Sequence, residues 1–245
     1  MGEYKIEECS TYAESREIGG IPVYIFEKHN MALPAWGVVC NRIKKPAHLV
    51  TFDNHTDTHW GFNSYICEKT GKTPDYPKYG LKNPHIMDLL TNTHFQIGDF
   101  SFEDVWSISV SDLKNTEQIL CGVDFGYLLS YMVVNREDGV GSGYEKDDRR
   151  AGYQATYISR ESWDEWNVEL MPEPLIVDFD LDFFGSPNDF DDKFENKVAP
   201  LLKKAVAITI AKEPKYFECC KTQENYTVEA ALTQLLDFIE EALES

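Results

Sequence analysis

One stretch of the chain limits its fold more than any other, an apolar run that ends in alternating acids and histidines. Residues 49–52 favour a β-strand, and Asp53, His55, Asp57 and His59 follow at every second position. An apolar strand that delivers polar groups at its carboxyl end is typical of a buried parallel strand. Side chains on a strand alternate between its two faces, so the first three polar residues would point the same way if the strand continued.

Far downstream, a second stretch has the same design. A strand is expected over residues 175–182, in which Asp178, Asp180 and Asp182 alternate with apolar side chains. Carboxylates gathered in a dry interior repel one another, and a divalent cation is the simplest way to neutralise them. The two stretches together therefore predict a shared metal site, while the alternative is two solvent-exposed acidic strand ends.

The other apolar runs alternate between strand-like and helix-like patterns, and residues 1–20 are expected to be irregular. The ranges expected as further strands are Ile21–Phe26, 105–110, 155–158 and 207–210. The ranges expected as helices are 31–43, 84–90, 194–205 and 228–243. Residues 125–134 are apolar without a pattern that decides between strand and helix, and residues 61–83 and 135–152 have the composition of loops. This alternation predicts an α/β fold, with one domain over residues 1–245 and three α/β/α layers around a mostly parallel sheet.

The composition fits a globular domain that binds a cationic partner. Hydrophobic residues make up 42% of the 245-residue chain, which is enough for a sizeable core. A net charge of −19 argues against nucleic acid or an anionic membrane as a partner and suits a cationic substrate. The polar start and the lack of a long apolar run predict a cytoplasmic protein without a membrane span. These properties leave the oligomeric state open.

The cysteines carry a weaker signal. The chain has six of them, without the spacing of a zinc motif or a disulfide framework, so reduced thiols are expected. For the adjacent Cys219 and Cys220, two thiols packed in the core at a turn are the preferred interpretation, and a pair of metal ligands is the alternative.

The donor atoms of the two acidic stretches indicate which metal would bind. Carboxylate oxygens and imidazole nitrogens without a thiolate suit Mn²⁺, and suit Mg²⁺ or Zn²⁺ less well. The carboxylates outnumber what one ion needs, so we expect two ions about 3.5–4 Å apart. Such a pair lowers the pKa of bound water and directs the hydroxide to an electrophilic carbon or phosphorus.

These motifs resemble those of the arginase/agmatinase ureohydrolases, which have Asp-Ala-His-x-Asp on one strand and Ser-x-Asp-x-Asp on another. Residues 53–57 read Asp-Asn-His-Thr-Asp, with Asn54 in place of Ala. Residues 178–182 read Asp-Phe-Asp-Leu-Asp, with Asp178 in place of Ser. His29 follows an earlier strand, where the family has its first ligand. The pattern over residues 20–60, 180–184 and 208–214 is more closely similar to a compact arginase-like branch that includes the peptide arginases.

The resemblance implies a role for each polar residue. One manganese ion would be held by His29, Asp53, Asp57 and Asp180, and the other by His55, Asp53, Asp180 and Asp182. Asp57 would also orient the bridging hydroxide and accept its proton. Glu213 would bind the guanidinium group, unless it is a solvated turn residue. His59 is the first candidate for the proton shuttle, with His85 and His94 as others, although a supporting hydrogen bond explains His59 equally well.

The implied activity is that of a binuclear manganese hydrolase that cleaves a C–N bond of a guanidinium group. Arginine, or an arginine-containing peptide, would yield ornithine and urea. The loop that binds the amino-acid part of free arginine is not recognisable, which favours a larger substrate, and residues 183–187 stand where the family has Asp-Pro. The alternatives are a one-zinc amide deacetylase of the same fold, a non-catalytic metal-stabilised binding protein, and a two-metal phosphoesterase. The lack of a basic or glycine-rich phosphate cradle argues against the last.

Overall fold

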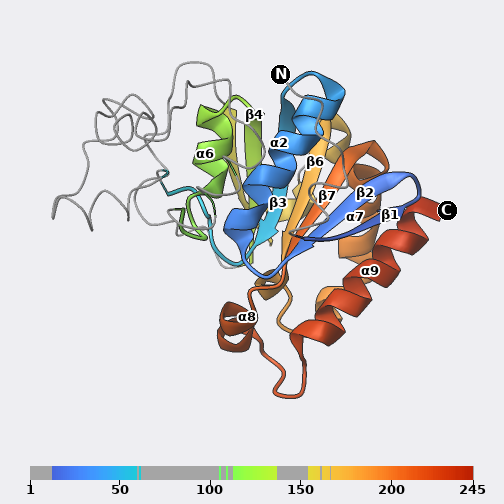
Figure 1. The fold of residues 1–245 in the computed structure, drawn as a ribbon. Helices are drawn as coiled ribbons and strands as arrows, with labels where there is room; N and C mark the ends of the chain where they lie inside the picture. The colour runs from blue at the N-terminus through green and yellow to red at the C-terminus, as the bar shows by residue number, and fades with distance from the viewer. Residues whose placement is uncertain are drawn as a thin grey trace, which may run out of the picture.

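The computed structural model describes residues 13–59, 61, 105, 109, 113–136, 154–160, 162–165 and 167–244. A seven-stranded sheet runs through the centre of this part of the chain, in the order β1-β2-β7-β6-β3-β4-β5 (Figure 1). Its strands are β1 (Glu14–Ile18), β2 (Ile21–Phe26), β3 (Ala47–Asp53), β4 (Leu128–Asn135), β5 (Gln154–Ser159), β6 (Leu175–Asp180) and β7 (Ala205–Ala211). Strand β1 pairs antiparallel with β2, and the other neighbouring pairs of this sheet are parallel. The predicted mostly parallel sheet is confirmed.

Helices cover both faces of the sheet (Figure 1). On one face, α2 (Ala32–Ile43) and α6 (Gln118–Asp124) contribute to a core that contains the fully buried Trp36. On the other face, α7 (Asp192–Lys204) and α9 (Val228–Glu244) form a second core around Phe194. Burial on both faces explains why strands such as β7 are apolar almost throughout, since each face must pack against a helix layer. The predicted α/β/α layering is confirmed.

Short helices complete the described chain. They are η1 (His29–Met31), η4 (Ser162–Glu165), η5 (Val168–Leu170), η6 (Leu181–Phe183), η7 (Pro187–Asp189) and α8 (Pro214–Cys220). Helix α8 follows β7 directly and lies beyond the carboxyl ends of the central strands (Figure 1). No helix among the described residues is long and apolar enough to cross a membrane.

Three sequence-based expectations need correction, and one open assignment is settled. Residues 14–18 form the edge strand β1, which the sequence hides because only Ile18 of its five residues is buried. The strand expected over residues 105–110 is wrong at the two positions that the structure describes, since Val105 and Ser109 are helical. The undecided segment 125–134 contains β4. The strand expected over 175–182 ends at Asp180 and continues as η6.

Several expectations fall outside the described residues. These are the helix over residues 84–90, the loops over 62–83 and 137–152, and the candidate residues His85 and His94.

The register of the central strands brings the two acidic stretches to one edge of the sheet. Phe52 of β3 pairs with Phe179 of β6, and their rings stack with centroids 5.1 Å apart. Asp53 and Asp180 are the next residues on these neighbouring parallel strands. Because parallel strands end at the same edge, both carboxylates lie where α/β sheets place their sites.

Candidate metal centre

Four side chains converge at the carboxyl ends of β2, β3 and β6. His29 lies in η1 directly after β2, Asp53 ends β3, Asp180 ends β6, and Asp57 follows β3. His29 Nδ1 lies 2.9 Å from Asp57 Oδ2, 3.2 Å from Asp180 Oδ2 and 3.5 Å from Asp53 Oδ2. All four residues are buried, and one ligand atom of each lies within 4.8 Å of the others. We call these four residues the buried cluster.

Asp57 reaches the buried cluster through a turn of the backbone. Strand β3 ends at Asp53 and does not continue to Asp57, so strand alternation does not set the direction of this side chain. Asp57 has a φ of 49°, in the left-handed region that non-glycine residues rarely adopt. Gln118, at the start of α6, donates its Nε2–H to Asp57 Oδ2 over 2.7 Å. The turn and this hydrogen bond, not strand alternation, aim the Asp57 carboxylate at His29.

Asp178 fixes the orientation of His29. It precedes Asp180 by two residues in β6 and accepts a 2.7 Å hydrogen bond on Oδ2 from His29 Nε2–H. Its register partners Thr51 in β3 and Thr209 in β7 both donate their hydroxyl hydrogens to the same carboxylate. A carboxylate oxygen only accepts hydrogen bonds, so the contact of Asp178 Oδ2 with His29 Nε2 assigns a proton to that nitrogen. In the neutral imidazole, the form that binds a metal, the lone pair on His29 Nδ1 then faces the acids of the buried cluster.

The network around Asp178 extends to helix α2. Trp36 Nε1–H donates to Thr209 Oγ1 over 3.3 Å. Because a hydroxyl carries one hydrogen, accepting from Trp36 leaves that hydrogen to point at Asp178. The core of one sheet face is thus joined by hydrogen bonds to the imidazole of His29.

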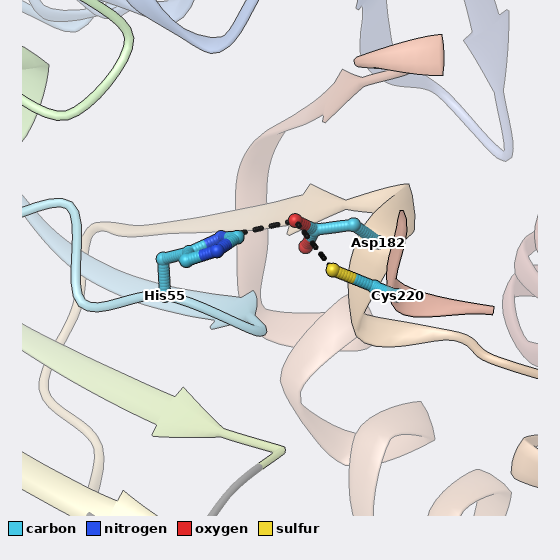
Figure 2. A group of neighbouring side chains, drawn as sticks. All are labelled: His55, Asp182 and Cys220. Atoms are coloured by element: carbon cyan, nitrogen blue, oxygen red, sulfur yellow. Dashed lines mark hydrogen bonds and ion pairs between the residues drawn. The ribbon is translucent and has the colours of Figure 1, made fainter. Parts of the chain in front are cut away.

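A second group lies beside the first and comes from three segments of the chain (Figure 2). His55 follows β3, Asp182 lies in η6, and Cys220 ends α8. His55 Nδ1 lies 3.0 Å from Asp182 Oδ2, and Cys220 Sγ lies 3.9 Å from the same oxygen. Asp182 is fully buried, whereas the His55 side chain is 46% exposed. We call His55, Asp182 and Cys220 the outer cluster.

Asp53 connects the two clusters. Its Oδ2 faces His29 in the buried cluster, while its Oδ1 lies 3.7 Å from His55 Nδ1 in the outer cluster. The backbone N–H of His55 donates to the same Oδ1 over 2.6 Å. One carboxylate therefore presents an oxygen to each group, which is the arrangement of a residue that bridges two ions.

Several acids lie close together in the buried cluster, and the pKa values of Asp53, Asp180 and His29 are raised. Burial, followed by the charge of Asp57, raises the pKa of Asp53 to about 6. Burial and the charge of Asp182 raise the pKa of Asp180 well above its usual value. Burial by itself would lower the pKa of His29, but Asp178 and the other facing acids raise it well above 6.5. Without a metal ion, protons partly neutralise the charge that a cation would neutralise.

In the outer cluster, too, the pKa values of His55 and Cys220 are shifted toward the protonated forms. Hydrogen bonds with Asp182 and Asp53 raise the pKa of His55 to about 12. Burial and the charge of Asp182 raise the pKa of the Cys220 thiol to about 11. A divalent cation would supply positive charge in place of the protons and favour the ligand forms of both groups.

Two orphaned polar atoms test whether a cation fits the buried cluster. His29 Nδ1 and Asp53 Oδ2 are buried without a hydrogen-bond partner in the described part of the molecule. Buried polar atoms are normally satisfied, and an unsatisfied one points to a missing water or ion. Both atoms face each other across 3.5 Å, among further carboxylate oxygens. The donor set of one imidazole and three carboxylates therefore fits a divalent cation.

The two remaining sequence candidates lie differently. Glu213 is buried and its Oε1 accepts a 2.9 Å hydrogen bond from the backbone N–H of His29. Burial raises its pKa to about 7, so the interpretation of a solvated turn residue is wrong. His59 lies in neither cluster. Its backbone N–H donates to the carbonyl oxygen of Thr116, and its ring Nδ1 lies 3.3 Å from Thr116 Oγ1.

Sequence reasoning did not establish the roles of three residues of the site. The alternation of Asp178 with Asp180 and Asp182 places it in the acidic stretch, but the pattern does not show that it contacts His29. Gln118 gave no signal, because its partner is 61 residues away. Cys219 and Cys220 do not form a core-packed pair, since Cys219 is exposed and Cys220 is partly buried beside His55. The donor set at the outer cluster therefore includes a thiol that the sequence-based choice of metal had left out.

Comparisons with known proteins identify the fold. No family model and no curated protein sequence matches the chain. A solved structure of a hypothetical agmatinase from Burkholderia thailandensis is similar, with a TM-score of 0.50 and 12% identity over 90% of this chain and 58% of that one. Similar structures also include proclavaminate amidino hydrolase from Streptomyces clavuligerus (TM-score 0.48, 14% identity, 91% of this chain and 64% of that one) and arginase from Medicago truncatula (TM-score 0.49, 12% identity, 91% and 58%).

The likeness to the agmatinase structure concerns the fold. The chain has the arginase-like α/β fold that its motifs suggested. It spans about three fifths of the length of the structures it matches. At 12% identity a shared fold does not establish a shared reaction, so activity has to be argued from the two clusters.

Proposed function

We propose that this chain is a metal-dependent hydrolase of the arginase/agmatinase superfamily that cleaves a C–N bond of a guanidinium group. The observation that carries the proposal is the convergence of His29, Asp53, Asp57 and Asp180, with two orphaned buried atoms facing each other between them. The arginase-like fold supports the same family. The net charge of −19 suits a cationic substrate.

Two ions, with Mn²⁺ proposed, would occupy the two clusters. The buried cluster would hold one ion, and His55 and Asp182 the other, with Asp53 and Asp180 proposed as the ligands that the two ions share. When bound, such a pair lowers the pKa of a water molecule to near neutrality and so supplies a hydroxide nucleophile. The chemistry thus calls for a nearby base and for a group that holds the cationic substrate.

Asp57 and Glu213 are assigned these two tasks. Asp57 Oδ2 lies 2.9 Å from His29 Nδ1 and is held by Gln118, so it is positioned to orient a water molecule and accept its proton. Glu213 Oε1 is fixed by the backbone N–H of His29, and Oε2 is the atom that we assign to the guanidinium. His59 remains a candidate proton donor to the departing amine.

The experiment that tests the proposal is a urea-release assay on the full chain loaded with Mn²⁺. Free arginine, agmatine and arginine-containing peptides are compared, and bound metal is measured in the same samples. We expect two ions per chain and urea release, greatest with a peptide substrate. Asp180→Asn should lose bound metal and activity together, whereas the exposed Asp237→Asn serves as a matched control that keeps both.

Other outcomes would favour the alternatives. One zinc ion per chain with acetate release from an acetylated amine would favour an amide deacetylase. Two bound ions with no turnover of any guanidino compound would favour a metal-stabilised binding protein. Full activity in Asp180→Asn would refute the assigned metal site.

A further inference from the structure

Cys220 lies where a ligand of the outer cluster would lie. Its Sγ is 3.9 Å from Asp182 Oδ2, the oxygen that also faces His55 Nδ1 (Figure 2). Ligand bonds of about 2.0–2.3 Å place the atoms around a tetrahedral zinc ion roughly 3–4 Å apart. The observed separations of 3.0 Å and 3.9 Å match that spacing.

The backbone holds the thiol in this place. Cys220 O accepts a 2.8 Å hydrogen bond from Arg136, which follows β4. The guanidinium of Arg136 packs so tightly against Gly185 that a Cβ on this glycine would lie 2.1 Å from its Nη2. Gly185 O in turn accepts a 2.8 Å hydrogen bond from Thr222 N, two residues after Cys220. The end of α8 is therefore tied to the segment that carries Asp182.

A hydrogen-bond donor also faces the sulfur of Cys220. Asn54 Nδ2 donates to Cys220 Sγ over 3.2 Å, so a donor already points at the sulfur as it would at a metal-bound thiolate. The neighbouring Cys219 differs, since it is exposed and belongs to neither cluster. Two cysteines that are adjacent in sequence thus occupy different environments.

We propose that Cys220 Sγ is a metal ligand, and that it makes the outer cluster a nitrogen, oxygen and sulfur site that prefers Zn²⁺ to the second Mn²⁺ of the proposed function. The ligands would be His55 Nδ1, Asp182 Oδ2 and Cys220 Sγ, with Asp53 Oδ1 3.7 Å from the imidazole as the fourth. Thiolates favour zinc, whereas the buried cluster offers only oxygen and nitrogen, which suit manganese. The proposal takes from the proposed function only that an ion lies beside His55, and it does not depend on turnover.

Cobalt substitution of the full metal-free chain tests the proposal. A thiolate bound to Co²⁺ gives an intense charge-transfer band in the near ultraviolet, which oxygen and nitrogen ligands do not give. We expect this band in the wild type and in Cys219→Ser, and its loss in Cys220→Ser. Circular dichroism of the metal-free variants checks that they are folded.

A metal competition adds a readout of selectivity. After dialysis against equal Zn²⁺ and Mn²⁺, the wild type should hold zinc at the outer cluster, and Cys220→Ser should bind zinc at least tenfold more weakly. Cys220→Asp should bind an ion without the charge-transfer band and shift the preference toward Mn²⁺.

The outcomes separate this inference from the proposed function. A band that persists in folded Cys220→Ser, or two bound cobalt ions without a band in the wild type, overturns the inference even if urea is released. A band that depends on Cys220 without urea release supports the inference and counts against the proposed activity. A wild-type chain that binds no cobalt overturns both.

Discussion

Asp53 connects the buried cluster with the outer cluster, but the two clusters are built in different ways. The buried cluster is placed by strand ends and by η1, and the His29 side chain is fully buried. The outer cluster is placed by the segment after β3 and by two short helices, and the His55 side chain is 46% exposed. The sheet thus makes a rigid position deep in the protein and a more open position at its edge.

The difference in burial between the two clusters suggests that they affect different properties of the protein. Removing a charged group from the buried cluster leaves its partners unpaired in a dry interior, so this cluster is coupled to the stability of the fold. In the outer cluster, His55 and Cys220 are partly solvated, so these two residues can change with less cost to folding than buried Asp182 or the buried cluster. We therefore expect folding to depend mainly on the buried cluster, and the choice of metal to depend mainly on the outer one.

The largest expected effect comes from the residue that connects the clusters. Asp53→Asn should lose both ions and reduce urea release by at least about 10³-fold, because both positions lose a carboxylate. Asp182→Asn touches the outer cluster and should keep one ion. Metal analysis of the two purified variants measures the comparison, with Asp237→Asn as the control. Equal metal loss in both variants would contradict the division into two clusters.

The histidines should differ in their effect on folding. His29→Asn leaves Asp178 and the acids of the buried cluster without their cation, and should lower the free energy of unfolding by about 3–5 kcal/mol. His55→Asn changes a half-exposed residue and should cost less than about 1 kcal/mol. Urea denaturation of the metal-free proteins measures both values. A loss in His55→Asn as large as that in His29→Asn would remove the distinction between the clusters.

The buried cluster should also make the metal-free chain more stable in mild acid. Asp53, Asp180 and Glu213 have raised pKa values, so between about pH 4 and 7 the folded state binds more protons than the unfolded state. The free energy of unfolding therefore falls as the pH rises through this window, and the raised pKa of His29 acts in the same direction.

Thermal unfolding at pH 5 and pH 8 measures this dependence. The metal-free melting temperature should be lower at pH 8, and added Mn²⁺ should stabilise more at pH 8 than at pH 5, because the ion competes with protons. A metal-free chain that is more stable at pH 8 would mean that other groups dominate.

The smallest expected effect concerns the support of His29. Thr209→Val removes a hydrogen bond to Asp178 and the acceptor of Trp36, and should cost about 1–2 kcal/mol. Metal affinity at the buried cluster should fall by roughly 10–100-fold. Thr233→Val, at an exposed helical position, is the matched control and should change stability by less than about 0.5 kcal/mol. Titration with Mn²⁺ decides whether the loss is confined to one of the two ions.

The sequence predicted what short-range patterns encode. The apolar runs of β2, β3 and β6 and the acids at the ends of β3 and β6 indicated a parallel sheet with polar groups at one edge. Some apolar segments fit either a strand or a helix. The segment that contains β4 is one of these, because its apolar residues show neither the strand nor the helix periodicity. The edge strand β1 was not predicted, because most of its side chains are exposed and its sequence therefore has no apolar run.

The parts of the site that the sequence did not reveal depend on contacts between distant elements. Thr51, Asp178 and Thr209 form one row across three strands, and only the register of those strands aligns them. Cys220 meets Asp182 because α8 folds back over the end of the sheet, across 38 residues of chain. Patterns over a few neighbouring residues therefore cannot predict either contact.

The placement of Asp53 has a thermodynamic consequence. Its two carboxylate oxygens face different clusters, so an ion bound at one position fixes the orientation of the carboxylate that the other position needs. The two binding equilibria are then coupled, and each ion must change the affinity of the other by the same factor. The chain should fill its two positions as a cooperative unit, whose metal content at a given concentration is a property of the pair.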